Sequence, residues 1–262
     1  AVVRHFVLER GWTVTNVDKL TYAANLTALH SVSNAPNYVF VNADICDRTA
    51  LAAVFARAQP DAIVHLAAES HVDRSIAGSM PFIQSNIVGT HALLEETRHY
   101  LDRCSPQRRA RFRFLHVSTD EVFGSLEPGG IFTEQSPYMP RSPYSASKAA
   151  SDHLVRAWHE TYGLPVIITN CSNNYGPYQY PKKFIPTVIL SAVNGHAIPI
   201  YGDGRHIRDW LHVDDHVRAL AAALRFGEVG DSYVIGGRAP MENMAVALKI
   251  CDVLDRFCPA AR

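Results

Sequence analysis

Short apolar runs alternate with segments of helical periodicity through the first two thirds of the chain. Segments 49–57, 81–100 and 147–162 have the period and length of helices. Parallel strands need long crossover connections, and a helix is the usual one, so this alternation is typical of βα units. It predicts an α/β fold built on a doubly wound parallel sheet. The strands are expected at residues 13–17, 38–41, 62–67, 112–117 and 166–169.

The pattern changes near residue 172, where a turn-rich stretch precedes short strands and helices. We expect a Rossmann-like dinucleotide-binding domain over 1–171 and a smaller, interleaved substrate-binding lobe over 172–262. Residues 1–8 are apolar at positions 2, 3, 6 and 7, as in the middle of a helix, and 254–262 also has a helical pattern. We therefore expect a chain truncated at both ends, with its first strand and glycine-rich loop missing and its lobe incomplete.

Charge and cysteine content argue against several classes of partner. The 25 lysines and arginines balance the 25 aspartates and glutamates, so net charge favours neither nucleic acid nor a membrane surface. The five cysteines lack paired metal or disulfide spacing, as is typical of reduced thiols. The sequence contains neither a signal-peptide layout nor an apolar stretch near the ~20 residues of a membrane span. A cytoplasmic protein that acts on a small polar substrate is expected.

Acidic and small residues follow the first three expected strands. Asp18 stands where a dinucleotide fold hydrogen-bonds the adenosine ribose, and a carboxylate there favours NAD over NADP. An ordinary turn aspartate explains Asp18 alone equally well. Asp44, Ile45 and residues 66–70 lie at the ends of the next two strands, where adenine and the nicotinamide side of a bound cofactor would lie.

Tyr144 and Lys148 stand four residues apart at a helix start and can share one helical face. A phenol has an ordinary pKa near ~10, so a tyrosine base at pH 7 needs its pKa lowered by about three units, or ~4 kcal/mol. We predict that the Lys148 cation supplies this shift and holds the nicotinamide ribose, and that Thr119 orients a sugar hydroxyl. A helix-start tyrosine beside a solvated lysine is the plainer interpretation of the pair. The preceding Ser118-Thr119 favours the catalytic one.

Asp120 and Glu121 form an acid pair at the end of the fourth expected strand. Dehydrogenation alone needs no second acid and base, whereas elimination does. Once C4 of a sugar is a ketone, a carboxylate can remove the C5 proton while a carboxylic acid protonates the departing C6 hydroxyl. A solvated acidic turn that caps the next segment is the alternative.

At this point the chain resembles the extended short-chain dehydrogenase/reductases, most closely the dTDP-glucose 4,6-dehydratases, over essentially all its length. The resemblance implies a homodimeric hydro-lyase of nucleotide-sugar metabolism and deoxysugar biosynthesis. In that reaction hydride passes from C4 to NAD and returns to C6, giving dTDP-4-keto-6-deoxyglucose. The matching motifs are Val17 to Ala23, Ala67 to Ser75, Ser118 to Val122, Tyr144 to Ala150, and Asn170 to Pro177.

The resemblance also implies roles for single residues. Asp120 would protonate the C6 hydroxyl, Glu121 would take the C5 proton, and Tyr144 would take the C4 hydroxyl proton, with Thr119 and Lys148 assisting. NAD would contact Asp18, Lys19, Leu20, Thr21, Asp44, Ile45, Leu66, Ala67, Ala68, Glu69, Ser70, Ser85, Tyr144, Lys148 and Asn174. The sugar nucleotide would contact Ser70, Thr119, Asn173, Lys183, Phe184, Pro199, Ile200, Tyr201, Arg208 and Asn243.

The residue types of Lys183 and Arg208 support their assignment apart from the resemblance. A nucleotide diphosphate needs positive partners, and arginine can bind it through two nitrogens. Three positions depart from the family pattern: Ala24 replaces a glycine, Phe123 a tyrosine and Ser85 a threonine. No metal is expected, since the histidines at positions 65, 71, 206, 212 and 216 show no ligand cluster.

Three alternatives share parts of this pattern. A UDP-glucose 4,6-dehydratase or a UDP-sugar 4-epimerase would also use Thr119, Tyr144 and Lys148. Asp120 and Glu121 disfavour the epimerase, because an acid and a base beside C5 and C6 would promote loss of the C6 hydroxyl. A catalytically silent binding or assembly protein is the alternative of a different class, and the retained set of five catalytic residue types argues against it.

Overall fold

The structure is a computed structural model that describes residues 1–127 and 129–257. The chain forms two compact units, and each is described by itself. The larger unit consists of Ala1–Cys171 and Val217–Ile235, and the smaller unit consists of Ser172–His216 and the segment that begins at Gly236. The sequence pattern did not locate the return of Val217–Ile235 to the larger unit.

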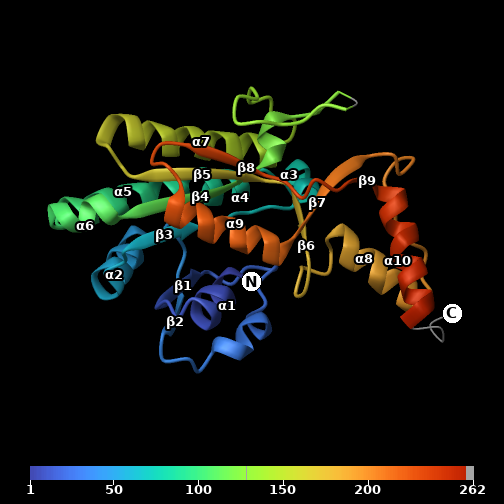
Figure 1. Ribbon diagram of the computed structural model, residues 1–262, viewed down its shortest axis with the longest axis horizontal. Helices are drawn as coiled ribbons and strands as arrows, with labels where there is room; N and C mark the ends of the chain where they lie inside the picture. The colour runs from blue at the N-terminus through green and yellow to red at the C-terminus, as the bar shows by residue number, and fades with distance from the viewer. Residues whose placement is uncertain (128, 258–262) are drawn as a thin grey trace. The chain divides into compact units, whose positions relative to one another are not determined.

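All strands of the larger unit pair in parallel, which confirms the α/β class. β1 (Val14–Asp18) pairs with β2 (Tyr38–Asn42). A separate four-stranded sheet has the order β3-β4-β5-β8 (Figure 1). Its strands are β3 (Ala62–His65), β4 (Arg113–Thr119), β5 (Val166–Cys171) and β8 (Ser232–Ile235). Within the described residues, β1 and β3 each keep one unpaired edge, so the sheet expected to be continuous consists of two parts.

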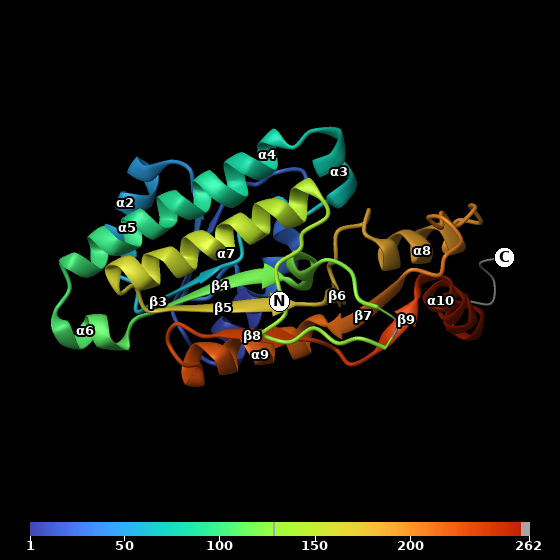
Figure 2. The same cartoon turned by 90° about the horizontal axis from the view of Figure 1, so that it is seen from above.

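Helices cover both faces of the four-stranded sheet, as a doubly wound fold requires. α5 (Thr90–Asp102) and α7 (Pro143–Tyr162) lie side by side on one face (Figure 2). α9 (Val213–Phe226) packs on the other face through residues of the larger unit. Side chains alternate along a strand, so Phe114, Val166 and Ile168 join the core beneath α5 and α7, whereas Leu115 and Ile167 pack against Leu220 of α9.

The other helices of this unit are short, apart from α2. The chain opens with α1 (Val2–Arg4), which continues into a π-helix at His5–Glu9 and so confirms the helical pattern expected there. The helix expected over 81–100 is present but composite: α4 (Met80–Phe82) leads through a π-helical stretch, Ile83–Gly89, into α5. The remaining described helical segments are two 3-10 helices, Leu26–Val32 and Asp120–Phe123, and the helices α2 (Arg48–Ala58), α3 (Val72–Ala77) and α6 (Pro106–Arg111).

The start of α7 is fixed by capping side chains. The Ser142 hydroxyl accepts a hydrogen bond from the backbone N–H of Ser145, and the Ser145 hydroxyl accepts one in return from the backbone N–H of Ser142, which forms a capping box. Pro143 occupies the first helical position, where its fixed φ suits a helix and its missing N–H costs nothing. α7 therefore begins four residues earlier than the sequence pattern predicts, and it ends at Gly163 in the left-handed conformation, φ 65°.

We expect the variant Ser142→Ala to lower the free energy of unfolding by about 1 kcal/mol, because the Ser145 N–H loses its side-chain acceptor. Urea denaturation followed by far-UV circular dichroism measures this change. Ser142→Thr keeps a hydroxyl and serves as the matched control. Equal stability of Ser142→Ala and the wild type would show that this cap contributes nothing.

The smaller unit is a three-stranded mixed sheet with two helices. β6 (Asn173–Tyr175) pairs in parallel with β7 (Ile207–His212), which pairs antiparallel with β9 (Pro240–Glu242). α8 (Phe184–Val193) and α10 (Asn243–Phe257) pack on each other. The helical pattern expected over 254–262 is confirmed to Phe257, and residues 258–262 lie outside the described residues. Of the described helices, none is both long and apolar enough to cross a membrane.

Candidate active site

The carboxyl end of β4 turns directly into a short 3-10 helix, Asp120–Phe123, and this turn carries three candidate residues. Thr119 caps the turn, because its Oγ1 accepts a hydrogen bond from the Glu121 backbone N–H at 3.2 Å. Thr119 is buried, while Asp120 and Glu121 are half-buried. One hydroxyl and two carboxyl groups therefore lie together at the strand end where open α/β sheets bind ligands.

Tyr144 lies in the first turn of α7 and is brought to this strand end. It is 9 % exposed, and its ring packs edge-on against Phe82 with centroids 6.3 Å apart. Its backbone N–H donates to Ser75 Oγ at 3.2 Å, which ties the helix start to α3. The phenol shares a hydrogen bond with Thr119. The structure thus places Thr119 and Tyr144 in direct contact, as the sequence predicts.

The electrostatic environment of Tyr144 differs from the one predicted. Burial raises the pKa of Tyr144, and the negative charge of Glu121 raises it further, while the hydrogen bond with Thr119 acts in the opposite direction. With only the side chains of the protein present, the pKa of Tyr144 is raised, so the prediction that Lys148 lowers it is wrong for this state. The physical reason is that the phenol is desolvated beside a carboxylate, whereas the Lys148 ammonium donates elsewhere, to the Val117 carbonyl oxygen at 2.9 Å.

Lys148 is one turn beyond Tyr144 and is only 4 % exposed. Burial lowers the pKa of Lys148, and the charge of Asp152 opposes this effect. A lysine with this degree of burial is rare unless it is paired. Its charge therefore depends on the groups around it, and one of these is the carboxylate of Asp152, one turn further along α7.

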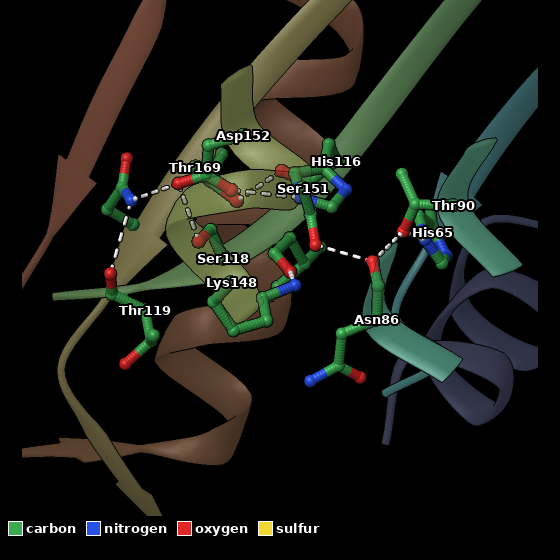
Figure 3. A network of polar contacts seen from close by, with 12 residues as sticks. His65, Asn86, Thr90, His116, Ser118, Thr119, Lys148, Ser151, Asp152 and Thr169 are labelled. Atoms are coloured by element: carbon green, nitrogen blue, oxygen red, sulfur yellow. Dashed lines mark hydrogen bonds and ion pairs between the residues drawn. The ribbon is translucent and has the colours of Figure 1, made fainter. Parts of the chain in front are cut away.

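Asp152 is the centre of a buried polar network behind the candidate residues (Figure 3). It is 0 % exposed, and both carboxylate oxygens accept hydrogen bonds. His116 Nε2 lies 3.0 Å from Oδ1. Three donors reach Oδ2: Ser118 Oγ at 2.8 Å, Tyr138 Oη at 2.9 Å and Asn170 Nδ2 at 3.2 Å. The network joins α7 to β4, β5 and the loop that carries Tyr138.

Sequence reasoning did not predict this network. Two patterns could have indicated three of its members. His116 and Ser118 interrupt an apolar strand at alternate positions, so they point to the same face. Asp152 follows Lys148 by four residues and Tyr144 by eight, which places all three along one side of a helix. The sequence does not show that this side of the helix is buried, and without burial the same spacing is typical of a solvated polar face.

Most of the predicted cofactor residues of the larger unit line one cavity of about 900 Å³. The unpaired edges of β1 and β3 border this cavity. A carboxylate lies at the end of β1, and small apolar side chains follow β3, which suits the ribose and the flat rings of a dinucleotide. The predicted residues in the lining are Asp18, Lys19, Thr21, Ile45, Leu66, Ala67, Ala68, Glu69 and Ser85. The predicted residues of this unit outside the lining are Leu20, Asp44, Ser70, Tyr144 and Lys148.

The walls of this cavity are tied together by polar side chains. Lys19 Nζ donates to Asp44 Oδ2 at 3.2 Å and to Ser85 Oγ at 2.9 Å. Hydrogen bonds of Lys19 and Cys46 outweigh the burial of Asp44 and hold its pKa below the ordinary value. Asn86, which sequence reasoning missed, pairs with both backbone groups of Glu69, accepting at 2.8 Å and donating at 2.9 Å. These contacts fix the segments that follow β1, β2 and β3.

The predicted substrate residues fall into both units. Ser70 and Thr119 belong to the larger unit, and the others belong to the smaller one. Lys183 is the N-cap residue of α8, and the Phe184 ring stacks on Trp210 with centroids 6.0 Å apart. Arg208 is exposed on β7. The remaining members in the smaller unit are Asn173 on β6, the loop residues Pro199, Ile200 and Tyr201, and Asn243 at the start of α10. Asn174, predicted to contact the cofactor, hydrogen-bonds His216 at 2.8 Å within the same unit.

The described residues contain no group of three histidine, cysteine or acidic side chains able to hold a metal ion. Cys46, Cys104, Cys171 and Cys251 are free thiols, and Cys258 lies outside the described residues. Cys171 Sγ lies 3.4 Å from the Ser118 carbonyl oxygen, close to the candidate residues.

Comparison with known proteins gives consistent matches. The profile described as GDP-mannose 4,6 dehydratase matches residues 1–256. The dTDP-glucose 4,6-dehydratase of Shigella flexneri is 55% identical over 268 residues, which cover 99% of this chain and 74% of that protein. The structure of DesIV, a dTDP-glucose 4,6-dehydratase from Streptomyces venezuelae with NAD and TYD bound, is 44% identical with a TM-score of 0.89, covering 97% of this chain and 76% of that one. A UDP-glucuronic acid 4-epimerase from Bacillus cereus with NAD is 25% identical with a TM-score of 0.86, covering 98% and 79%.

Proposed function

The chain belongs to the dTDP-glucose 4,6-dehydratases within the GDP-mannose 4,6 dehydratase family, and from this premise we propose that it dehydrates dTDP-glucose to dTDP-4-keto-6-deoxyglucose with NAD. The observation that carries the proposal is the meeting of two residue sets at one strand end. Thr119 and Tyr144 share a hydrogen bond, and Asp120 and Glu121 follow in the same turn. The first set suits an oxidation, and the second suits an elimination.

NAD fits the cavity of the larger unit, because its lining combines the Asp18 carboxylate with the apolar side chains of Ile45, Leu66 and Ala67. When bound, NAD supplies a hydride acceptor and the positive charge of its oxidised nicotinamide ring. A positive charge near Tyr144 would offset the effects of burial and Glu121, which raise the pKa of this phenol. Tyr144 is proposed to take the proton of the C4 hydroxyl, with Thr119 orienting that hydroxyl and Lys148 assisting.

The acid pair is proposed to carry the elimination. Glu121 takes the C5 proton, and Asp120 gives a proton to the departing C6 hydroxyl. Adjacent carboxyl groups can divide these roles only if one is ionised and the other protonated. In the smaller unit, Lys183 and Arg208 are proposed to bind the diphosphate, for which arginine offers paired donors.

Two further properties belong to the proposal. α5 and α7 lie side by side on the larger unit, and we propose that they form the contact of a homodimer. Sedimentation of the purified protein tests this, and a monomer at micromolar concentration would contradict it.

We also propose a cytoplasmic location, consistent with free thiols at the described cysteines.

One assay tests the function. The protein is incubated with NAD and either dTDP-glucose or UDP-glucose, and the product is detected by the alkali-induced absorbance of a 4-keto-6-deoxy sugar. We expect product from dTDP-glucose. Product from UDP-glucose alone would assign a UDP-glucose dehydratase, and a C4 epimer without loss of water would assign an epimerase. Cofactor binding without turnover, also in a chain extended to the length of the relatives, would indicate a binding protein.

Asp18 provides a separate prediction about the cofactor. Its Oδ1 accepts a hydrogen bond from the Leu20 N–H at 2.7 Å, so Asp18→Asn can keep this turn while it loses the negative charge. We expect NAD to bind about tenfold more weakly to Asp18→Asn, because a charge-assisted hydrogen bond to the ribose becomes a neutral one. NADP should bind more tightly than to the wild type, because its 2′-phosphate no longer meets a carboxylate. Fluorescence titration with both cofactors measures the two changes, and an unchanged ratio of affinities would remove Asp18 from the cofactor site.

A further inference from the structure

The candidate site contains a buried cation whose charge the proposed roles leave unexplained. Lys148 is 4 % exposed, and its ammonium donates a hydrogen bond to the neutral carbonyl oxygen of Val117 at 2.9 Å. Burial of an ammonium strongly disfavours its charged form. A lysine at this position keeps its proton only if a negative charge lies nearby in the same desolvated region.

Asp152 is placed to provide that charge. It lies one turn after Lys148 on α7, so both side chains lie on one side of the helix. Figure 3 shows Lys148 beside the network that Asp152 centres. Its carboxylate is solvated by four protein donors at 2.8 to 3.2 Å, which take the place of water around a buried anion.

The network favours the ionised form of Asp152. Burial alone would raise the pKa of Asp152, but the hydrogen bond from His116, the charge of Lys148 and the hydrogen bond from Ser118 oppose it, and the pKa of Asp152 is lowered. Oδ1 and Oδ2 both act as acceptors, as an ionised carboxylate requires.

His116, in contrast, is neutral at pH 7. Burial, and then the charge of Lys148, lower the pKa of His116 to about 4. In the described part of the chain, His116 Nδ1 is buried without a hydrogen-bond partner, so a proton there would have no acceptor. The imidazole therefore donates from Nε2 to Asp152 as a neutral ring. The close pair of His116 and Asp152 carries one negative charge in total, and that charge remains to balance Lys148.

We propose that the buried carboxylate of Asp152 is the counter-charge that keeps Lys148 cationic in the active site. Asp152 is then a positioning residue, because it acts through Lys148. The predicted effect on kcat/KM rests on the proposed function, whereas the predicted protonation of Lys148 does not. Among the described residues, the other titratable groups that face this region are His65 on β3, Tyr138 in the loop before α7, Tyr144 and Arg156 on α7, and Cys171 on β5.

The same carboxylate also holds the end of β4. Asn170 Nδ2 donates to Asp152 Oδ2 at 3.2 Å and to the Thr119 carbonyl oxygen at 3.2 Å. Ser118, the neighbour of Thr119, donates to the same carboxylate. One anion thus connects the helix that carries Tyr144 and Lys148 to the strand end that carries Thr119, Asp120 and Glu121.

The direct test measures the protonation of Lys148 without turnover. In protein labelled with ¹³C at the lysine ε-carbon, the NMR shift of that carbon reports the charge of the ammonium, and Lys148→Met assigns its resonance. We expect Asp152→Asn to lower the pKa of Lys148 by on the order of one unit or more, the size of the effect of a close opposite charge. Asp152→Glu should restore most of this shift. A resonance that titrates alike in the wild type and in folded Asp152→Asn would overturn the proposal.

A second variant keeps the test decisive if Asp152→Asn does not fold. Tyr138→Phe removes one donor to the carboxylate and leaves its charge in place. Losing a donor to the ionised form raises the pKa of Asp152. As the solution is acidified, Asp152 should then become protonated at a higher pH than in the wild type, and Lys148 loses its counter-charge there. The acid limb of the kcat/KM profile should therefore move to higher pH. An acid limb that stays unchanged, with the Lys148 resonance also unchanged, would contradict the proposal.

Kinetics separate this inference from the proposed function. In Asp152→Asn we expect the alkaline limb of kcat/KM to move to lower pH, because Lys148 loses its proton sooner. A merely structural role of Asp152 would lower the melting temperature and leave this limb in place. If the wild type fails to dehydrate dTDP-glucose, the proposed function fails, and the NMR titration of Lys148 still decides the inference.

Discussion

Replacing Glu121 by glutamine is expected to stop the reaction after the oxidation step. Glutamine has nearly the same shape, but it cannot take the C5 proton, so the 4-keto intermediate keeps its C6 hydroxyl. General-base catalysis contributes about 10²- to 10⁴-fold, and product formation should fall by that factor. Oxidation at C4 does not use Glu121 and should continue. Single-turnover mixing with dTDP-glucose should therefore show reduced nicotinamide absorbance that appears and then persists.

The matched control is Glu127→Gln. Glu127 is exposed on the loop that follows the 3-10 helix, and the same chemical change there removes a charge close in sequence. We expect this variant to turn over like the wild type. If Glu121→Gln lost oxidation and elimination to the same extent, the assignment of Glu121 to C5 would be wrong.

Replacing Tyr144 by phenylalanine is expected to abolish both steps. The oxidation at C4 comes first, and without a base for the C4 hydroxyl proton no ketone forms. We expect a loss of about 10²- to 10⁴-fold in product formation, with no reduced nicotinamide at any time. Removing the hydroxyl also takes away a hydrogen bond with Thr119. Stopped-flow absorbance under the same conditions as for Glu121→Gln distinguishes the two variants.

Tyr162→Phe is the control for this change, because Tyr162 ends the same helix and is 44 % exposed. It should retain wild-type turnover. Titration of Tyr144→Phe with NAD shows whether the fold of the cofactor cavity survives. Accumulation of reduced nicotinamide in Tyr144→Phe would show that another group takes the C4 hydroxyl proton.

The strands and their parallel pairing could be predicted because each buried strand is a short, nearly uninterrupted apolar run. The end of β4 was predicted two residues too early, at Val117, because its apolar run stops at Ser118 while the strand continues to Thr119. The π-helical stretch Ile83–Gly89 could not be predicted, because its hydrogen bonds depend on packing against α4, α5 and α7. The position of β8 could not be predicted either, because its four residues form a strand by pairing with β5.

The candidate site could be predicted in its parts and less well in its electrostatics. The spacing of Tyr144 and Lys148 shows that they share a helical face, but not that both are buried. Burial reverses the expected effect on the pKa of Tyr144, because desolvation and Glu121 dominate it. Asp152 and His116 looked like ordinary polar residues, and only the folded chain shows that they are 0 % exposed and paired at 3.0 Å.

The central claim is that one site oxidises C4 and then returns the same hydride to C6. Incubation with dTDP-glucose that carries deuterium at C4 tests this most directly, with the product analysed by NMR and mass spectrometry. The account predicts that the deuterium appears at C6 of a 4-keto-6-deoxy product and that no reduced cofactor accumulates. Deuterium that remains at C4, or that is lost to the solvent, would contradict it.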